Sequence, residues 1–121
     1  MKKFTGFTLI EVLIAIAIVA ILFGIAFPSY QSHIQKSNRI AAQLALTKLA
    51  QEFERVNARQ GAYPTTLPTI DATDSYTYAL PSVTDDTFTI TATPKMSDEC
   101  GTLSITQTGE TASSKSSGCW D

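Results

Sequence analysis

One apolar run near the N-terminus constrains this chain more than any other feature of its sequence. Residues 7–27 are apolar except for Thr8, Glu11 and Gly24. As a helix the run would be about 30 Å long, which matches the hydrocarbon thickness of a bilayer. It is also longer than the apolar region of a secretory signal peptide. The run therefore predicts a helix that can cross a membrane.

Lysines before this run indicate its orientation in the membrane, and a glutamate within it places a charge in an apolar segment. Lys2 and Lys3 precede the run, and positive residues favour the cytoplasmic side of a membrane. Glu11 lies inside the run, one helical turn after Phe7. Because an unpaired carboxylate in lipid is energetically costly, Glu11 needs a partner.

The residues around Gly6 resemble a known processing signal. A short basic leader that ends in Gly6, followed by FTLIE and an apolar run, resembles the prepilin signal of type IV pilins and pseudopilins. The resemblance implies that a leader peptidase cleaves after Gly6 and methylates the new N-terminus at Phe7. It also implies that Glu11 pairs with the positive N-terminus of a neighbouring subunit during assembly. A plain membrane anchor that tolerates Glu11 is the alternative.

A second helical half is predicted beyond Pro28. Apolar residues recur there at steps of four and three, the pattern of an amphipathic helix: Ala42, Leu46, Leu49, Phe53 and Val56. Charged residues, Arg39 among them, fall largely on the other faces. Pro28 predicts a kink, and the resemblance adds it to the assembly residues. We expect a leader at 1–6, a membrane or filament-core half of the helix at 7–28 and an amphipathic half at 29–60.

Residues 61–121 predict a small sheet. Residues 62–75 hold two prolines and no clear period, as expected of a connection. Three β-like runs follow, at 76–80, 87–93 and 101–107. Pro81 is expected to end the first of them. An antiparallel sheet packed on the apolar face of 29–60 fits this pattern, so we expect an α+β protein with a soluble headpiece at 29–121.

The two cysteines predict a cross-link. Cys100 and Cys119 both lie in the part that the orientation above places outside the cytoplasm. Cysteines in exported domains are typically paired, and a bridge over this loop would contribute roughly 3 kcal/mol of stability. It would hold the polar tail against the sheet as a disulfide-bonded C-terminal loop. A metal site is the alternative, which two thiols and the lone His33 disfavour.

The C-terminal region extends the resemblance. The segments FTITATP, ECGTLSITQTGE and GCW resemble the C-terminal signature of minor type IV pilins of the PilE-like group. The resemblance implies the type IV pilin fold and a structural subunit that enters the pilus or primes its assembly, for twitching motility, adhesion or DNA uptake. Its implied partners are other pilins, the prepilin peptidase and the assembly machinery. The subunit would wait in the inner membrane, with its C-terminal domain periplasmic, and end in an extracellular pilus.

The inventory of side chains disfavours an enzyme. The chain has one histidine, and it has no Gly-rich phosphate loop and no arguable Cys–His or Ser–His arrangement. Acidic residues pair at 71/74, 85/86 and 98/99, where we interpret them as turn formers and solubilising residues. A calcium site like that of type II secretion pseudopilins is the alternative, but no stretch has the spacing of a calcium loop. We therefore expect no enzymatic activity, no cofactor and no metal.

The charge balance disfavours direct binding to nucleic acid. The formal charge is −2, and removal of the leader through Gly6 changes it to −4, because seven basic residues then stand against eleven acidic ones. Beyond Arg59 only Lys95 and Lys115 are basic. Nucleic-acid surfaces need clustered cations. A DNA-binding competence pilin and a type II secretion pseudopilin are therefore the alternatives to a structural minor pilin.

Overall fold

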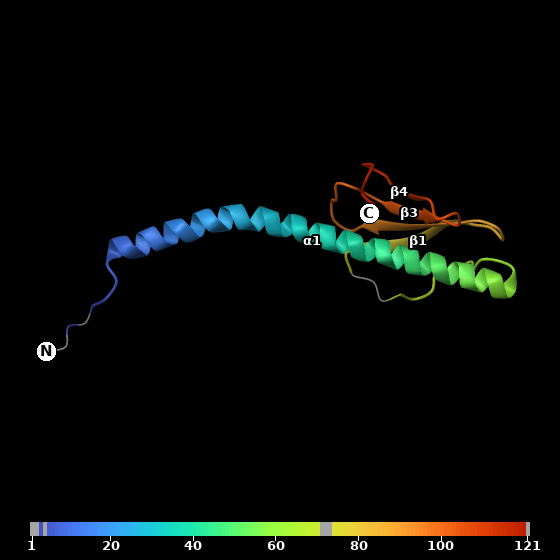
Figure 1. Cartoon of the computed structure of the whole chain (residues 1–121), viewed down its shortest axis with the longest axis horizontal. Coiled ribbons are helices and arrows are strands. Elements are labelled where there is room, and N and C mark those ends of the chain that lie inside the picture. The colour runs from blue at the N-terminus through green and yellow to red at the C-terminus, as the bar shows by residue number, and fades with distance from the viewer. Residues whose placement is uncertain (1–2, 4, 71–73, 121) are drawn as a thin grey trace. The chain divides into compact units, whose positions relative to one another are not determined.

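One helix and four strands follow each other along the chain in the order α1, β1, β2, β3 and β4 (Figure 1). The computed structural model describes residues 3, 5–70 and 74–120. Lys2 and Asp71, which entered the sequence analysis, lie outside the described residues. The chain forms two compact units, residues 1–35 and 36–121, and each is described by itself.

Helix α1 spans Leu9–Gln60 and passes through Pro28 without a break in its helical assignment. It begins two residues later than predicted, because Thr8 is the residue that caps it. In the first unit every residue from Leu9 to Gln35 is exposed. By length and composition this helix could cross a membrane.

The second unit holds a four-stranded sheet with the strand order β1-β2-β3-β4 and all neighbours antiparallel. Its strands are β1 at Tyr76–Val83, β2 at Phe88–Pro94, β3 at Leu103–Thr106 and β4 at Thr111–Ser113. The strands predicted at 76–80, 87–93 and 101–107 correspond to β1, β2 and β3. Strand β4 was not predicted, because its three residues are polar or small and do not alternate with apolar ones.

Pro81 does not end β1, and that part of the prediction was wrong. The register of β1 on β2 shifts between Ala79 and Ser82, so Leu80 and Pro81 together face one residue of β2. This is a bulge on an edge strand, a position where the missing N–H of proline breaks no ladder bond.

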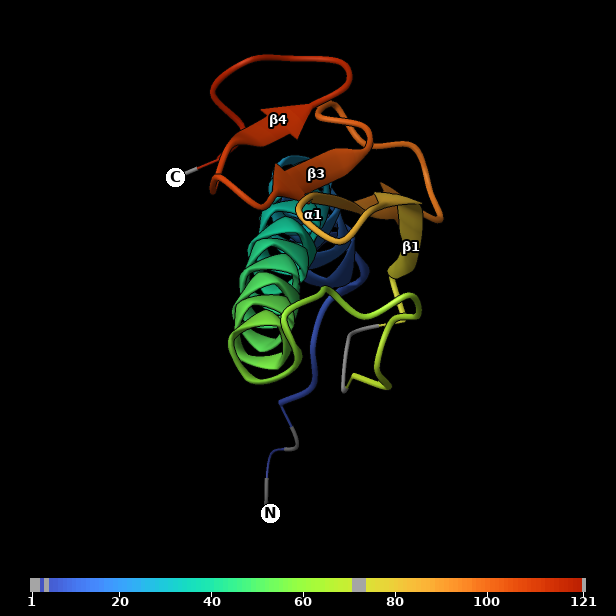
Figure 2. The ribbon, with the colours of Figure 1, turned by 90° about the vertical axis from the view of Figure 1, so that its right-hand side faces the viewer.

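The core lies between the sheet and the residue 36–60 part of α1, which Figure 2 shows in green beneath the strands. The predicted stripe on α1 is buried from Ala42 to Phe53, and Val56 is half-buried. The ring of Phe53 lies 5.0 Å from that of Phe88 on β2. Tyr63, from the connection after α1, lies 4.8 Å from Phe88 and closes this end of the core. The amphipathic half of the helix thus carries the sheet and, through it, the tail.

Candidate functional site

The start of α1 holds a reciprocal pair of hydrogen bonds between Thr8 and Glu11. The Thr8 N–H donates to Glu11 Oε2 over 2.9 Å, and the Glu11 N–H donates to Thr8 Oγ1 over 3.3 Å. This is a capping box, whose sequence pattern is Thr-x-x-Glu. Thr8 was not predicted from the sequence as the partner that Glu11 needs. In the uncleaved chain the Phe7 nitrogen belongs to a peptide bond, so Glu11 is held here by neutral donors.

The predicted disulfide between Cys100 and Cys119 is present, with their Cα atoms 6.0 Å apart. Cys100 is fully buried beside the core, and Cys119 is half-buried. The tail is therefore tied covalently to the segment that leads into β3, as expected of a disulfide-bonded C-terminal loop.

Arg39 and Asp98 form a buried ion pair next to this disulfide. Arg39 Nη2 donates to Asp98 Oδ1 and Oδ2 over 3.1 and 3.2 Å, and Nε donates to Oδ1 over 3.3 Å. Arg39 Nη2 also donates to Glu99 over 3.3 Å. The expectation of a solvent-facing Arg39 was wrong. Asp98 was interpreted as a turn former and a solubilising residue; it does accept the N–H of Cys100 in a turn, but it is buried and therefore does not act as a solubilising residue. Asp98 instead receives the guanidinium and also the N–H of Cys100, over 2.9 Å.

Gln43, one turn after Arg39, reaches the other end of the disulfide loop. Its side-chain Nε2 donates to the carbonyl oxygen of Cys119 over 2.6 Å. Gln43 is buried although it is polar, which indicates a specific contact rather than a solvated position. No periodicity in the sequence marks it, because its partner lies 76 residues away.

Tyr76, the first residue of β1, has a buried side chain on which the charges of Asp98 and Arg39 act. Burial raises the pKa of its phenol, the Asp98 carboxylate raises it further and the Arg39 cation opposes them. Burial is also the main cause of the raised pKa of Tyr78. Within the described chain neither hydroxyl has a hydrogen-bond partner.

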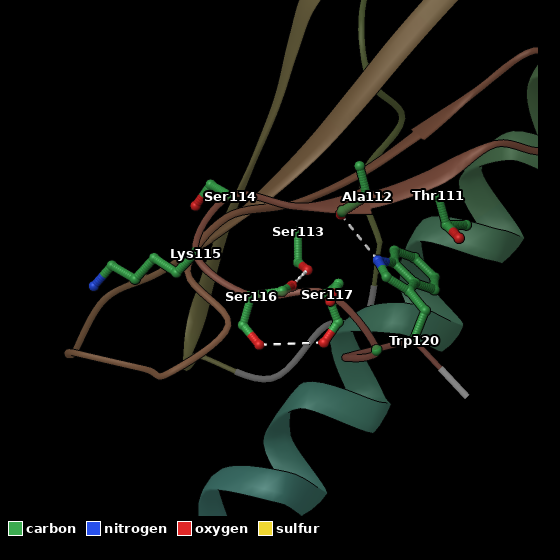
Figure 3. A pocket seen from close by; sticks show the side chains of 9 residues that line it. Thr111, Ala112, Ser113, Ser114, Lys115, Ser116, Ser117 and Trp120 are labelled. Carbon is green, nitrogen blue, oxygen red and sulfur yellow. Dashed lines mark hydrogen bonds between the residues drawn. The ribbon is translucent and has the colours of Figure 1, made fainter.

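The tail borders an open pocket of about 650 Å³ between β4 and Trp120 (Figure 3). We call it the tail cavity; its lining residues are Thr111, Ala112, Ser113, Ser114, Lys115, Ser116, Ser117, Gly118 and Trp120. The indole Nε1 of Trp120 donates to the Ala112 carbonyl over 2.9 Å, which fixes the ring against β4. Lys115 lies at the opposite end from Trp120, and its side chain extends away from the serine side chains that lie between them.

Gly101 makes this arrangement of the tail sterically feasible. Its φ is +67°, and a Cβ at this position would clash with the side chain of Ser114 and approach that of Lys115 to 2.9 Å. The backbone bonds from Ser114 N to Thr102 O (3.0 Å) and from Lys115 N to Cys100 O (3.2 Å) place the tail directly on this glycine.

The residues that line the tail cavity carry hydroxyl, ammonium and indole groups, and the sequence alone did not predict that these groups lie together. Hydroxyl and ammonium donors suit anionic oxygens, and an indole face suits a planar ring. Among the residues that the structure describes, no group of three or more His, Cys, Asp or Glu side chains could hold a metal ion.

Comparisons with known proteins identify the family from both parts of the chain. Residues 1–27 match the prokaryotic N-terminal methylation motif, and residues 28–104 match the family described as "Type IV minor pilin ComP, DNA uptake sequence receptor". That description names DNA, which the sequence analysis gave only as an alternative. The matched family is one of pilins, which are structural proteins, so the prediction of a protein that is not an enzyme is confirmed.

Individual relatives agree with this match. The chain is 45% identical to the fimbrial protein EcpB of Eikenella corrodens over 59% of its own length and 42% of that protein, so it spans less than half of this relative.

Among solved structures, a type IV pilin from Shewanella oneidensis is 30% identical, with a TM-score of 0.61 over 72% of this chain and 98% of that one. The minor pilin PilV of Neisseria meningitidis, at 22% identity, shares the fold with a TM-score of 0.60 over 71% of this chain and 92% of that one. The predicted pilin fold and prepilin signal are confirmed, and the chain belongs to the family of ComP-like type IV minor pilins.

Proposed function

We propose that this chain is a pilus subunit made as a precursor, cleaved after Gly6 and methylated at Phe7. The observation that carries the proposal is a leader of the prepilin type joined to a helix whose residues Leu9–Gln35 are all exposed. So much exposed apolar surface needs lipid or neighbouring helices around it. The precursor is stored in the inner membrane and then enters the fibre, where the same apolar surface packs against other pilins.

Cleavage gives Glu11 a second partner. The capping box needs only Thr8 and Glu11, so it survives removal of the leader. Cleavage turns the Phe7 nitrogen into a cationic amine, which methylation leaves charged. The amine of a neighbouring subunit then pairs with Glu11 in the apolar bundle. Pro28 acts in the same assembly step, at the end of the apolar run.

Mass spectrometry of the mature protein tests this processing. We expect an N-terminus at Phe7 that carries one additional methyl group. Gly6→Val should leave the precursor uncut, because a branched side chain blocks access of the peptidase to the peptide bond. Lys3→Gln, which leaves Gly6 in place, serves as a control that should still be cut. A mature N-terminus at any other residue would contradict the proposal.

We further propose that the subunit contacts DNA through the tail cavity. The groups that line the tail cavity support its choice as the contact, and the description of the matched family as a DNA uptake sequence receptor supports DNA as the ligand, although that match covers residues 28–104 and ends before the tail. The serine hydroxyls and Lys115 would receive phosphate oxygens, and the Trp120 ring would stack on a base. The tail cavity offers only one cation, Lys115, so stacking on Trp120 and the hydroxyl contacts would have to supply most of the affinity that a basic surface supplies in other DNA-binding proteins.

Binding of a labelled oligonucleotide to the full chain in detergent micelles tests the DNA contact. Trp120→Ala should weaken binding about tenfold, because base–aromatic stacking contributes about 1–3 kcal/mol. Lys115→Gln should lower the slope of log affinity against log salt by about 0.7 for a single strand. Lys95→Gln makes the same charge change outside the tail cavity and is the matched control. Equal effects of the two lysine changes, with none from Trp120→Ala, would exclude the tail cavity as the contact.

A further inference from the structure

Arg39 and Gln43, on two successive turns of α1, form hydrogen bonds at the two ends of the segment that the disulfide closes, residues 100–119. Arg39 binds Asp98, whose Oδ1 also accepts the N–H of Cys100. Gln43 binds the carbonyl of Cys119. The segment from Cys100 to Cys119 carries β3, β4 and the whole lining of the tail cavity except Trp120, which follows it directly. The position of that lining therefore depends on helix residues that do not line it.

The contact of Gln43 acts most directly on Trp120. Trp120 is held on one side by its indole hydrogen bond to Ala112. On the other side the chain reaches it through Cys119, which is fixed by the disulfide and by the Gln43 amide. Without the amide, the Cys119 carbonyl loses a donor in a half-buried place, and the peptide that leads to Trp120 can rotate. The disulfide alone fixes a sulfur atom and leaves this peptide plane free.

We propose that Gln43 is a positioning residue for the tail cavity, with Arg39 in support: the Gln43 amide sets the orientation of the Trp120 ring and so the affinity of the tail cavity for its ligand. The affinity part of this proposal rests on the proposed DNA contact. The orientation part does not, because it concerns the chain without any ligand.

The single tryptophan of the chain makes the orientation measurable. Trp120 is the only tryptophan of the chain, so tryptophan emission, excited at a wavelength that the four tyrosines do not absorb, reports on the tail cavity of the full chain in detergent micelles. Gln43→Glu keeps the shape of the side chain and replaces its donor by oxygen, which repels the Cys119 carbonyl. We expect a red-shifted emission and a lower anisotropy, together with about tenfold weaker oligonucleotide binding.

Gln51→Glu is the matched control, since it makes the same chemical change at an exposed position of the same helix. It should leave Trp120 fluorescence unchanged and weaken oligonucleotide binding much less than Gln43→Glu. Gln43→Leu avoids a buried charge and should reproduce the fluorescence change if Gln43→Glu fails to fold. Arg39→Gln is expected to act in the same direction, with a larger loss of folded protein.

Each outcome decides one part of the proposal. If Gln43→Leu folds with the fluorescence of the unmodified chain, the positioning role is excluded. If the unmodified chain does not bind the oligonucleotide but Gln43→Leu still alters Trp120, the DNA contact fails and the positioning role stands. If Trp120 changes while oligonucleotide affinity is retained, Gln43 orients the ring without controlling binding, and the affinity part is overturned.

Discussion

At the scale of single residues, the buried phenol of Tyr76 makes the headpiece sensitive to alkaline pH. Burial and the Asp98 carboxylate raise its pKa above the ordinary value of 10.0. A folded-state pKa above that of the unfolded chain means that the folded state holds the proton more tightly. The resulting contribution to stability is complete below about pH 10 and is lost as the pH rises from there through the folded-state pKa.

Tyr76→Phe should therefore remove part of this alkaline sensitivity. We expect the variant to gain stability relative to the unmodified chain between about pH 8 and about pH 11, because phenylalanine has no proton to lose on unfolding. Thermal unfolding of the full chain in micelles at both pH values measures the difference. A stability difference that is the same at the two pH values would contradict the assignment.

At the scale of elements, regular periodicity was predictable from the sequence and long-range polar contacts were not. The 3.6-residue stripe from Ala42 to Phe53 and the alternation in β2 follow from burial of one face, so both elements were predicted. The pairing of Arg39 with Asp98 joins residues 59 positions apart, and nothing local marks either as buried. For the same reason β4 was missed: only the closed tail brings its three residues beside β3.

The residues of the candidate site also differ in whether the sequence alone could predict them, because some belong to a local motif and others meet only in the folded chain. Gly6, Phe7 and Glu11 lie within six residues of each other around the start of α1, so a local motif was enough to single them out. The tail cavity combines Lys115 and Trp120 with hydroxyls whose relation depends on the disulfide, on the positive φ of Gly101 and on the Gln43 contact. Each residue alone is typical of a polar loop, and only the folded chain assembles them.

At the scale of the whole molecule, the proposed passage from membrane to fibre requires a subunit that is stable in lipid and can also be transferred to the fibre. The capping box gives the Glu11 carboxylate a neutral donor within its own helix. This donor lowers the cost of keeping a carboxylate in an apolar segment and leaves its charge available to a cationic partner. Under the proposed function, the helix start would serve both the stored and the assembled subunit.

Replacing Glu11 separates these two roles. Glu11→Gln keeps a side chain that can complete a capping box, so membrane levels and cleavage should stay normal, while the neighbour's amine is left unpaired at a cost of about 3–5 kcal/mol. Glu11→Ala removes both the charge and the cap. We expect both variants to be strongly depleted from sheared pili relative to their membrane pools, as measured by immunoblot. Recovery of both in pili at the level of the unmodified chain would exclude Glu11 as an assembly contact.

The bulge at Pro81 limits how the sheets of neighbouring headpieces can pair along their edges. β1 is an outer strand of the sheet, and an outer strand offers unpaired backbone groups to any other chain that comes near. Pro81 supplies no N–H there, and the bulge twists the strand away from a straight template. The opposite edge, β4, is only three residues long. Headpieces brought together at high density therefore offer each other no long, flat edge along which their sheets could pair, which disfavours an amyloid-like aggregate.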